Sequence, residues 1–170
     1  LVPQEWPWLL GAILFGGVLG PVALMFGLTY TSGATASLLL NLEAVLTALL
    51  AWVAFRENAD HRIVLGMVAI VAGGVVLSWP SGEANVSHWP GSLAIAAACL
   101  CWAIDNNLTR HVSATDALFI AGTKGLIAGV VNSSRALTLG AHLPDARILL
   151  ATMALGLPGY GLSPVLVVLA

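Results

Sequence analysis

Charged residues are scarce in this sequence. Only 8% of its 170 residues are Asp, Glu, Lys or Arg, whereas 59% are apolar, and the mean hydropathy is +0.95. Soluble domains carry roughly 25% charged residues. Because so few charges cannot cover a water-facing surface, we predict an integral membrane protein with almost nothing outside the bilayer.

Basic residues and cysteines are also scarce. The net charge of -2 excludes the basic footprint of a nucleic-acid-binding protein. Cys99 and Cys101 lie two residues apart and point to nearly opposite sides of a helix, so we expect packing residues rather than a disulfide or a zinc site. We expect no metal and no cofactor. No signal-peptide pattern opens the sequence, which ends within an apolar run, so we expect an excerpt of a longer membrane protein.

Long apolar runs take up most of the chain. A helix needs about 20 mostly apolar residues to cross the hydrocarbon core of a bilayer. We predict an all-α fold of about six such helices, at residues 8–29, 33–55, 62–79, 90–110, 116–138 and 148–170. Tryptophans near their ends favour the membrane interface, namely Trp6, Trp8, Trp52, Trp79 and Trp89. Small residues one turn apart permit close helix contact, as at Gly16 with Gly20, Ala69 with Gly73, and Gly125 with Gly129.

The arginines between these helices predict an orientation. The loops on the side where the first span begins contain Arg56, Arg62 and Arg110. The opposite loops contain Arg147, with Arg135 near a span end. Cytoplasmic loops are enriched in Lys and Arg. We therefore expect the first span to begin on the cytoplasmic side.

The first and last spans share a pattern. Gly16, Leu19, Pro21 and Val22 recur at a constant offset as Gly159, Leu162, Pro164 and Val165. By the predicted orientation the two spans run in opposite directions, which is typical of inverted-repeat transporters. Chance similarity between apolar segments is the alternative. Gly and Pro interrupt both spans, so each helix is expected to bend and to free backbone groups that can line a cavity.

Glu43 lies near the middle of the second span, with Asn41 close by. The two are about 200° apart around a helix and cannot both face one cavity. Glu43 shares a face with Thr47, and Asn41 shares one with Ser37. Charges within hydrocarbon are costly and usually functional. Glu43 is therefore either a proton-coupling carboxylate or cation contact, or a neutral or paired group that holds helices together.

The fourth and fifth spans carry further polar groups. Asp105, Asn106 and Asn107 lie one to two turns from the cytoplasmic end, where they are either functional or simply interfacial. Lys124 lies at a similar depth in the fifth span, and an ion pair with Asp105 would lower the cost of both charges. Snorkelling of Lys124 to the interface is the alternative. Because Lys124 and Arg135 share one face, with Asn132 beside it, we favour a stripe that faces a cavity.

Two hydroxyls, Tyr160 and Ser163, lie near the Gly/Pro break of the last span. Ser163 either contacts a solute or bonds back to its own helix. Taken together, these groups predict a cavity lined by the second, fourth, fifth and sixth spans. Glu43 would be the coupling carboxylate, Asp105 with Lys124 a gate or substrate-charge pair, and the two hydroxyls contacts at the helix break.

The stretch from Ala36 to Trp52, followed by Phe55-Arg56-Glu57 and by Gly66 to Leu77, resembles the EamA-type family of the drug/metabolite transporter superfamily. In that family a small-residue-rich helix, a short loop bearing Glu and a Gly-rich helix close one repeat, and Glu57, Gly66 and Gly73 occupy these positions. Ala98 to Ala103 resembles the opening helix of the second repeat, and Tyr160 to Ser163 its third. Many relatives carry Pro where Asn41-Leu42-Glu43 stands, so the resemblance does not show how this helix bends.

The resemblance implies ten helices in two inverted repeats of five, with this chain holding the third to eighth. Residues 1–80 would be the last three helices of the first repeat. Residues 81–90 would form an extracytoplasmic loop, and residues 91–170 the first three helices of the second repeat. Substrates in the superfamily range over amino acids, sugars, nucleotide sugars and drugs, so the resemblance fixes none.

We therefore expect a multi-pass secondary transporter of the plasma or inner membrane, and not an enzyme. It would export a small polar metabolite or drug-like solute by alternating access, coupled to protons or to an exchanged solute. The partners are that solute and membrane lipids, and a homodimer stays open. The alternatives are a non-transporting assembly or sensor subunit and an integral membrane lipid enzyme. The scatter of His61, His88, His111 and His142 over loops on both sides disfavours the enzyme.

Overall fold

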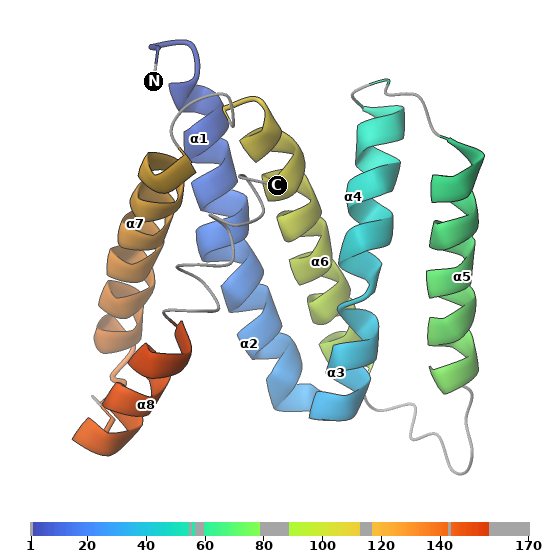
Figure 1. Cartoon of the computed structure of the whole chain (residues 1–170). Coiled ribbons are helices and arrows are strands. Elements are labelled where there is room, and N and C mark those ends of the chain that lie inside the picture. Colours follow the sequence, from blue (N-terminus) through green and yellow to red (C-terminus); the bar gives the residue numbers. More distant parts are fainter. Residues whose placement is uncertain are drawn as a thin grey trace. The chain divides into compact units, whose positions relative to one another are not determined.

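The computed structural model describes residues 2–54, 56, 60–78, 89–112, 117–142 and 144–156, and all regular structure in these residues is helical (Figure 1). The first helix consists of α1 (Trp6–Ala12), a π-helical segment η1 (Ile13–Leu19) and α2 (Gly20–Tyr30). The others are α3 (Gly33–Leu39), α4 (Leu42–Val53), α5 (His61–Ser78), α6 (Trp89–Arg110), α7 (Ala117–Thr138) and α8 (Ala146–Gly156).

The predicted all-α membrane fold is confirmed. A helix lies in each predicted span, but the second span is divided between α3 and α4, and the last is described only as far as Gly156. Three helices are both long and apolar enough to cross a bilayer, at Trp6–Tyr30, Gly33–Val53 and Trp89–Arg110. α7 has 22 residues, so its length also suffices. α5 and α8 are apolar and shorter where they are described. The second half of the predicted last span, from residue 157 on, lies outside the described residues.

Local sequence explains several helix ends. The Ser32 side chain accepts a hydrogen bond from the Thr35 backbone N–H at 3.2 Å and caps the start of α3. Gly140 ends α7 with a φ of +84°, a conformation that glycine adopts without strain. There the Gly140 N–H bonds the Leu137 carbonyl and the Ala141 N–H bonds the Ala136 carbonyl, which forms a Schellman motif.

The chain divides into two compact units. We call residues 19–107 the central unit, and residues up to Val18 together with those from Leu108 on the terminal unit. The chain therefore passes from one unit to the other at Val18–Leu19, within η1, and returns at Asn107–Leu108 near the end of α6. The predicted repeat boundary at residues 81–90 falls mostly outside the described residues, and this division stays a prediction.

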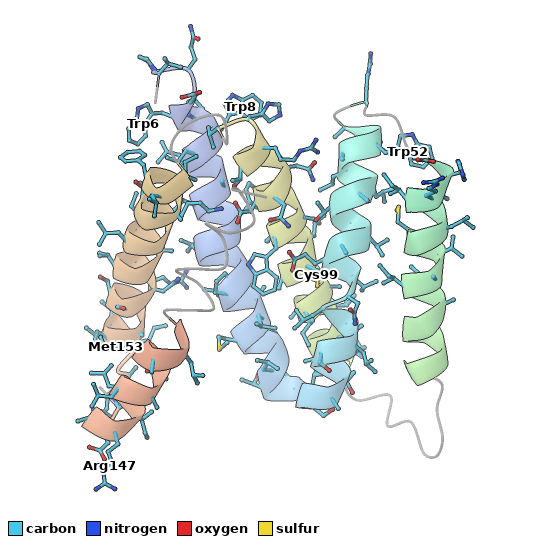
Figure 2. All side chains as sticks on the ribbon, viewed as in Figure 1. Trp6, Trp8, Trp52, Cys99, Arg147 and Met153 are labelled. Atoms are coloured by element: carbon cyan, nitrogen blue, oxygen red, sulfur yellow. The ribbon has the colours of Figure 1, made fainter. Side chains whose placement is uncertain are left out.

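The core of the terminal unit lies between α1, η1 and α7. It consists of the buried residues Leu9, Ile13, Val112 and Ile120, with the half-buried Ile127 packed against them. At the cytoplasmic end predicted for α1, the Trp8 ring stacks on His111 with ring centroids 4.5 Å apart. Figure 2 shows Trp6 and Trp8 at the N-terminal end of α1, where aromatic rings suit the membrane interface.

The core of the central unit lies where α2, α3, α4 and α6 meet. Ala36, Ile95 and Cys99 are buried there, and leucines of α2, α3 and α4 pack around them. α5 lies beside α3 and α4 (Figure 1). Close to this core, Gly27 of α2 faces Gly91 of α6, and a Cβ at Gly27 would lie 3.0 Å from the Gly91 carbonyl oxygen. These two glycines let the helix backbones approach closely.

Large apolar side chains remain exposed on the helices of both units. Those at least 60% exposed, on α4 to α8 and just after α7, are Val53, Leu65, Val68, Trp89, Leu118, Leu126, Leu139, Leu150, Met153 and Leu155. A water-soluble protein rarely exposes apolar patches of this extent. Such a surface suits lipid, as the membrane fold requires.

Candidate functional site

The second span is broken near its middle, between α3 and α4. Leu40 and Asn41 form a turn there, without Pro. The last carbonyls of a helix lack backbone donors and need other partners. The Asn41 amide nitrogen donates to the carbonyls of Ser37 at 3.2 Å and Leu38 at 3.1 Å. The Asn41 side chain thus supplies donors to the carbonyls at the end of α3.

Cys99 of α6 contacts backbone carbonyls at the same break from the neighbouring helix. Its thiol donates to the Leu39 carbonyl at 3.5 Å and lies 4.0 Å from the Leu40 carbonyl oxygen. Figure 2 labels this side chain between α6 and the α3–α4 segment. Cys99 and Cys101 are both free thiols, and Cys99 belongs to the central core, so the predicted packing role of Cys99 is confirmed.

Glu43 lies midway along the broken span, in the first turn of α4. A carboxylate is stabilised near a helix N-terminus by the helix dipole. The Asn106 amide nitrogen donates to Glu43 Oε1 at 3.0 Å and lies 3.4 Å from Thr47 Oγ1. The common face predicted for Glu43 and Thr47 is therefore confirmed. The structure brings Glu43 and Asn106 together, whereas the Asn41 donors bind backbone carbonyls of α3.

Asn107 fastens α6 to α4 beside this pair. Its side chain is 2% exposed, and its amide nitrogen donates to the carbonyls of Thr47 at 3.1 Å and Ala103 at 2.8 Å. Its Oδ1 has no hydrogen-bond partner among the described residues. Because both carbonyl oxygens can only accept hydrogen bonds, the amide nitrogen of Asn107 must face them, and the orientation of the amide is fixed. Sequence reasoning did not select Asn107 as a site residue, and the only signal for it is its place after Asp105 and Asn106.

Asp105 is 8% exposed and lies on α6 in the central unit. Lys124 lies on α7 in the terminal unit, where its ammonium group donates to Thr109 Oγ1 at 3.0 Å. The predicted ion pair would join the two units, and it stays a prediction. The bond to Thr109 directs Lys124 to a neighbouring helix, and the stripe that faces a cavity stays a prediction.

Asn132, on the same part of α7, contacts the first helix. Its amide nitrogen donates to the Gly17 carbonyl at 2.6 Å. Gly17 was missed by sequence reasoning. The signal was present, because Pro21 follows four residues later and lacks the N–H that would bond this carbonyl in an α-helix. Arg135 is exposed near the end of α7.

The last two predicted residues, Tyr160 and Ser163, lie outside the described residues, so their roles stay predictions. The structure thus places the remaining six in two separate groups. Asn41, Glu43, Asp105 and Asn106 belong to the central unit, and Lys124 and Asn132 to the terminal unit.

The Glu43 carboxylate is the chemically distinctive group of the central unit. Among the described residues of this unit, no Lys, Arg or His side chain forms an ion pair with it. Isolated charges in hydrocarbon cost roughly 3 kcal/mol or more. Such a carboxylate can therefore take up a proton or receive a cationic group. Within the described part of the chain, no three His, Cys, Asp or Glu side chains gather around a metal-sized space.

Comparison with known proteins gives the chain relatives among transporters. The model of the EamA-like transporter family matches residues 1–79, which include the α3–α4 break and Glu43. An "Uncharacterized transporter" of Methanothermobacter thermautotrophicus is 32% identical over 127 residues, which cover 72% of this chain and 37% of the relative. The "Uncharacterized transporter YyaM" of Bacillus subtilis is 31% identical over 134 residues, which cover 72% of this chain and 44% of the relative.

The chain thus spans about two fifths of the length of these curated relatives. No solved structure matches it. The family match confirms the resemblance drawn from the stretch Ala36 to Trp52 and from the Gly-rich helix that follows it. Similarity to the EamA-like transporter family is thus shown for residues 1–79 of the chain.

Proposed function

We propose that this protein is a secondary transporter of the plasma or inner membrane in which Glu43 is the coupling carboxylate. One observation carries the proposal. A carboxylate lies midway along a broken apolar helix, and its hydrogen bond comes from the amide of Asn106 on a neighbouring helix. The relatives, which are named as transporters, support the same class.

The Glu43–Asn106 contact suits a group that changes partners. An amide can donate to a carboxylate, and it can equally accept from a protonated carboxyl after rotation. The bond therefore lowers the cost of the negative charge on Glu43. Unlike a permanent ion pair, it does not hold Glu43 in its charged form. Glu43 would take up a proton or a cationic group on one side of the membrane and release it on the other. This cycle would couple solute movement to the gradient of the proton or of the cationic solute.

The broken second span suits alternating access. Discontinuous helices near the bilayer midplane commonly form the solute and ion sites of secondary transporters. The α3–α4 break lies directly before Glu43, so a solute held there would reach both the carboxylate and the start of α4. We propose export of a small polar metabolite or drug-like solute, in exchange for protons or a second solute. Asp105 with Lys124 as a gate, and Tyr160 with Ser163 as solute contacts, belong to this proposal.

The test uses the protein at its natural full length in liposomes that contain a pH-sensitive dye. A panel of small polar metabolites is applied, and the proton movement caused by each solute is recorded. Glu43→Gln keeps the shape of the side chain and an oxygen that accepts from Asn106, but removes the titratable group. We expect at least one solute to drive proton movement in the wild type, and a loss of roughly ten-fold or more in Glu43→Gln.

Asp60→Asn is the matched control, because Asp60 is an exposed loop carboxylate that pairs with His61. It should transport like the wild type. A second arm, exchange of labelled solute at equal pH on both sides, distinguishes solute exchange from proton coupling. Wild-type rates and pH dependence in Glu43→Gln, in both arms, would remove Glu43 from the mechanism. A protein that moves no solute in either arm would be an assembly or sensor subunit instead.

A further inference from the structure

The first helix contains an irregular segment, which the transport proposal does not use. Its register changes to π over Ile13–Leu19, and α2 then begins at Gly20-Pro21. Single π segments within helices often occur at functional positions. Pro21 has no N–H, so the α-helical donor to the Gly17 carbonyl is missing. In a membrane such a carbonyl requires another donor.

Asn132 of α7 supplies that donor, at 2.6 Å from the Gly17 carbonyl oxygen. The approach is possible because residue 17 is a glycine. A Cβ there would lie 2.7 Å from Cβ of Ala128, far inside ordinary contact distance. Ala128 and Asn132 are one turn apart on the same face of α7. Thus Gly17 lets the helices meet, and Asn132, one turn from Ala128 on α7, reaches the carbonyl that lacks its α-helical donor.

We infer that Asn132 is a positioning residue whose side chain replaces the backbone donor that Pro21 lacks and so clamps η1 to α7. On this inference the Asn132 amide binds a backbone carbonyl of the protein and does not bind the transported solute. The inference concerns Gly17, Asn132 and Pro21 alone. It stands whether or not Glu43 couples transport, and its test needs no substrate.

The test is a double-substitution cycle read by hydrogen–deuterium exchange of the full-length protein in nanodiscs. Asn132→Leu keeps the size of the side chain and removes the donor. We expect the amides of the η1 peptide to exchange about ten-fold faster in this variant, because the clamp no longer opposes local opening. Pro21→Ala restores the N–H, so adding it to Asn132→Leu should return the exchange rate close to the wild-type value.

Ser133→Ala, at the neighbouring exposed position of α7, is the control and should leave η1 exchange unchanged. If Asn132→Leu does not fold, the comparison is made in the Pro21→Ala background, where the Asn132 donor is redundant. There Pro21→Ala and Pro21→Ala with Asn132→Leu should exchange alike. A large difference between those two, or unchanged exchange in Asn132→Leu alone, would overturn the inference. Equal loss of protection throughout the protein, not rescued by Pro21→Ala, would overturn it as well.

Discussion

The close approach of α2 and α6 makes Gly27→Ala an informative substitution. An added Cβ would lie 2.6 Å from Ile95 Cγ1, 3.0 Å from the Gly91 carbonyl oxygen and 3.2 Å from the Ile95 nitrogen. Optimal carbon contacts are about 3.5–4.0 Å, so the two backbone contacts alone require the helices to separate by about 0.5 Å. The Ile95 side chain can rotate, but the two backbone atoms cannot move without the whole helix.

The size of the effect follows from two opposing terms. Overpacking of this kind costs about 1–3 kcal/mol. Replacing a helical glycine by alanine returns about 0.5–1 kcal/mol through the lower conformational entropy of the unfolded chain. The unfolding free energy of Gly27→Ala should therefore fall by about 0–2.5 kcal/mol, with a midpoint of about 1 kcal/mol. At Gly129 of α7 an added Cβ meets no described atom within 4 Å, so Gly129→Ala should gain the second term without the first.

The assay is the reversible unfolding of both variants and the wild type in mixed detergent micelles, followed by circular dichroism. The prediction is a difference in sign: Gly27→Ala less stable than the wild type, and Gly129→Ala at least as stable. Equal shifts in the two variants, in either direction, would refute the reasoning. The loss would then come from glycine chemistry in general and not from the contact between α2 and α6.

Three further predictions follow from single contacts. Asn107→Leu should change the unfolding free energy by less than about 1 kcal/mol, because the lost bonds are offset by removal of an acceptor without a partner, and thermal unfolding measures this. Thr109→Val removes one acceptor of Lys124 and should destabilise the same unfolding transition by about 1.5–3 kcal/mol, whereas Thr29→Val, whose hydroxyl bonds its own helix, should not. Cys101 should react with a small maleimide faster than the buried Cys99 in the folded protein, as measured by mass spectrometry, and equal rates would contradict the burial.

The positions of the helices are predictable because long apolar runs and polar loops are properties of the sequence alone. Ser32 before α3 and Gly140 after α7 illustrate this, since each has the residue type that the helix end needs. The break between α3 and α4 is different. No Pro or Gly marks Leu40-Asn41, and one donor to the carbonyls there is a thiol from α6 that no periodicity can place.

The contacts of the site were predictable only within one helix. The spacing of Glu43 and Thr47 gives their common face, but Asn106 is 63 residues away from Glu43, and only the packing of α6 on α4 brings it there. The small-residue pairs show the same limit. Gly125 and Gly129 have the expected spacing, yet an added Cβ meets no described atom at either, whereas the close contacts form at Gly17, Gly27 and Gly91. Spacing shows which face of a helix carries small residues, but it does not show which face packs against another helix.

The polar groups of this chain divide by what they bond. The Asn41 and Asn132 amides and the Cys99 thiol donate to backbone carbonyls next to a helix break, and a carbonyl in lipid needs such a donor whatever the protein transports. Glu43 differs, because its partner is a side chain that can also accept a hydrogen bond. Removing one of the donors to a carbonyl should therefore increase local opening of the helix segment that it contacts, which is the α3–α4 break or η1. Removing the charge of Glu43 should alter transport and leave the α3–α4 break and η1 intact. If every variant changes both local helix opening and transport, the irregular helix segments and the carboxylate act together, and the assignment of Glu43 alone to coupling is wrong.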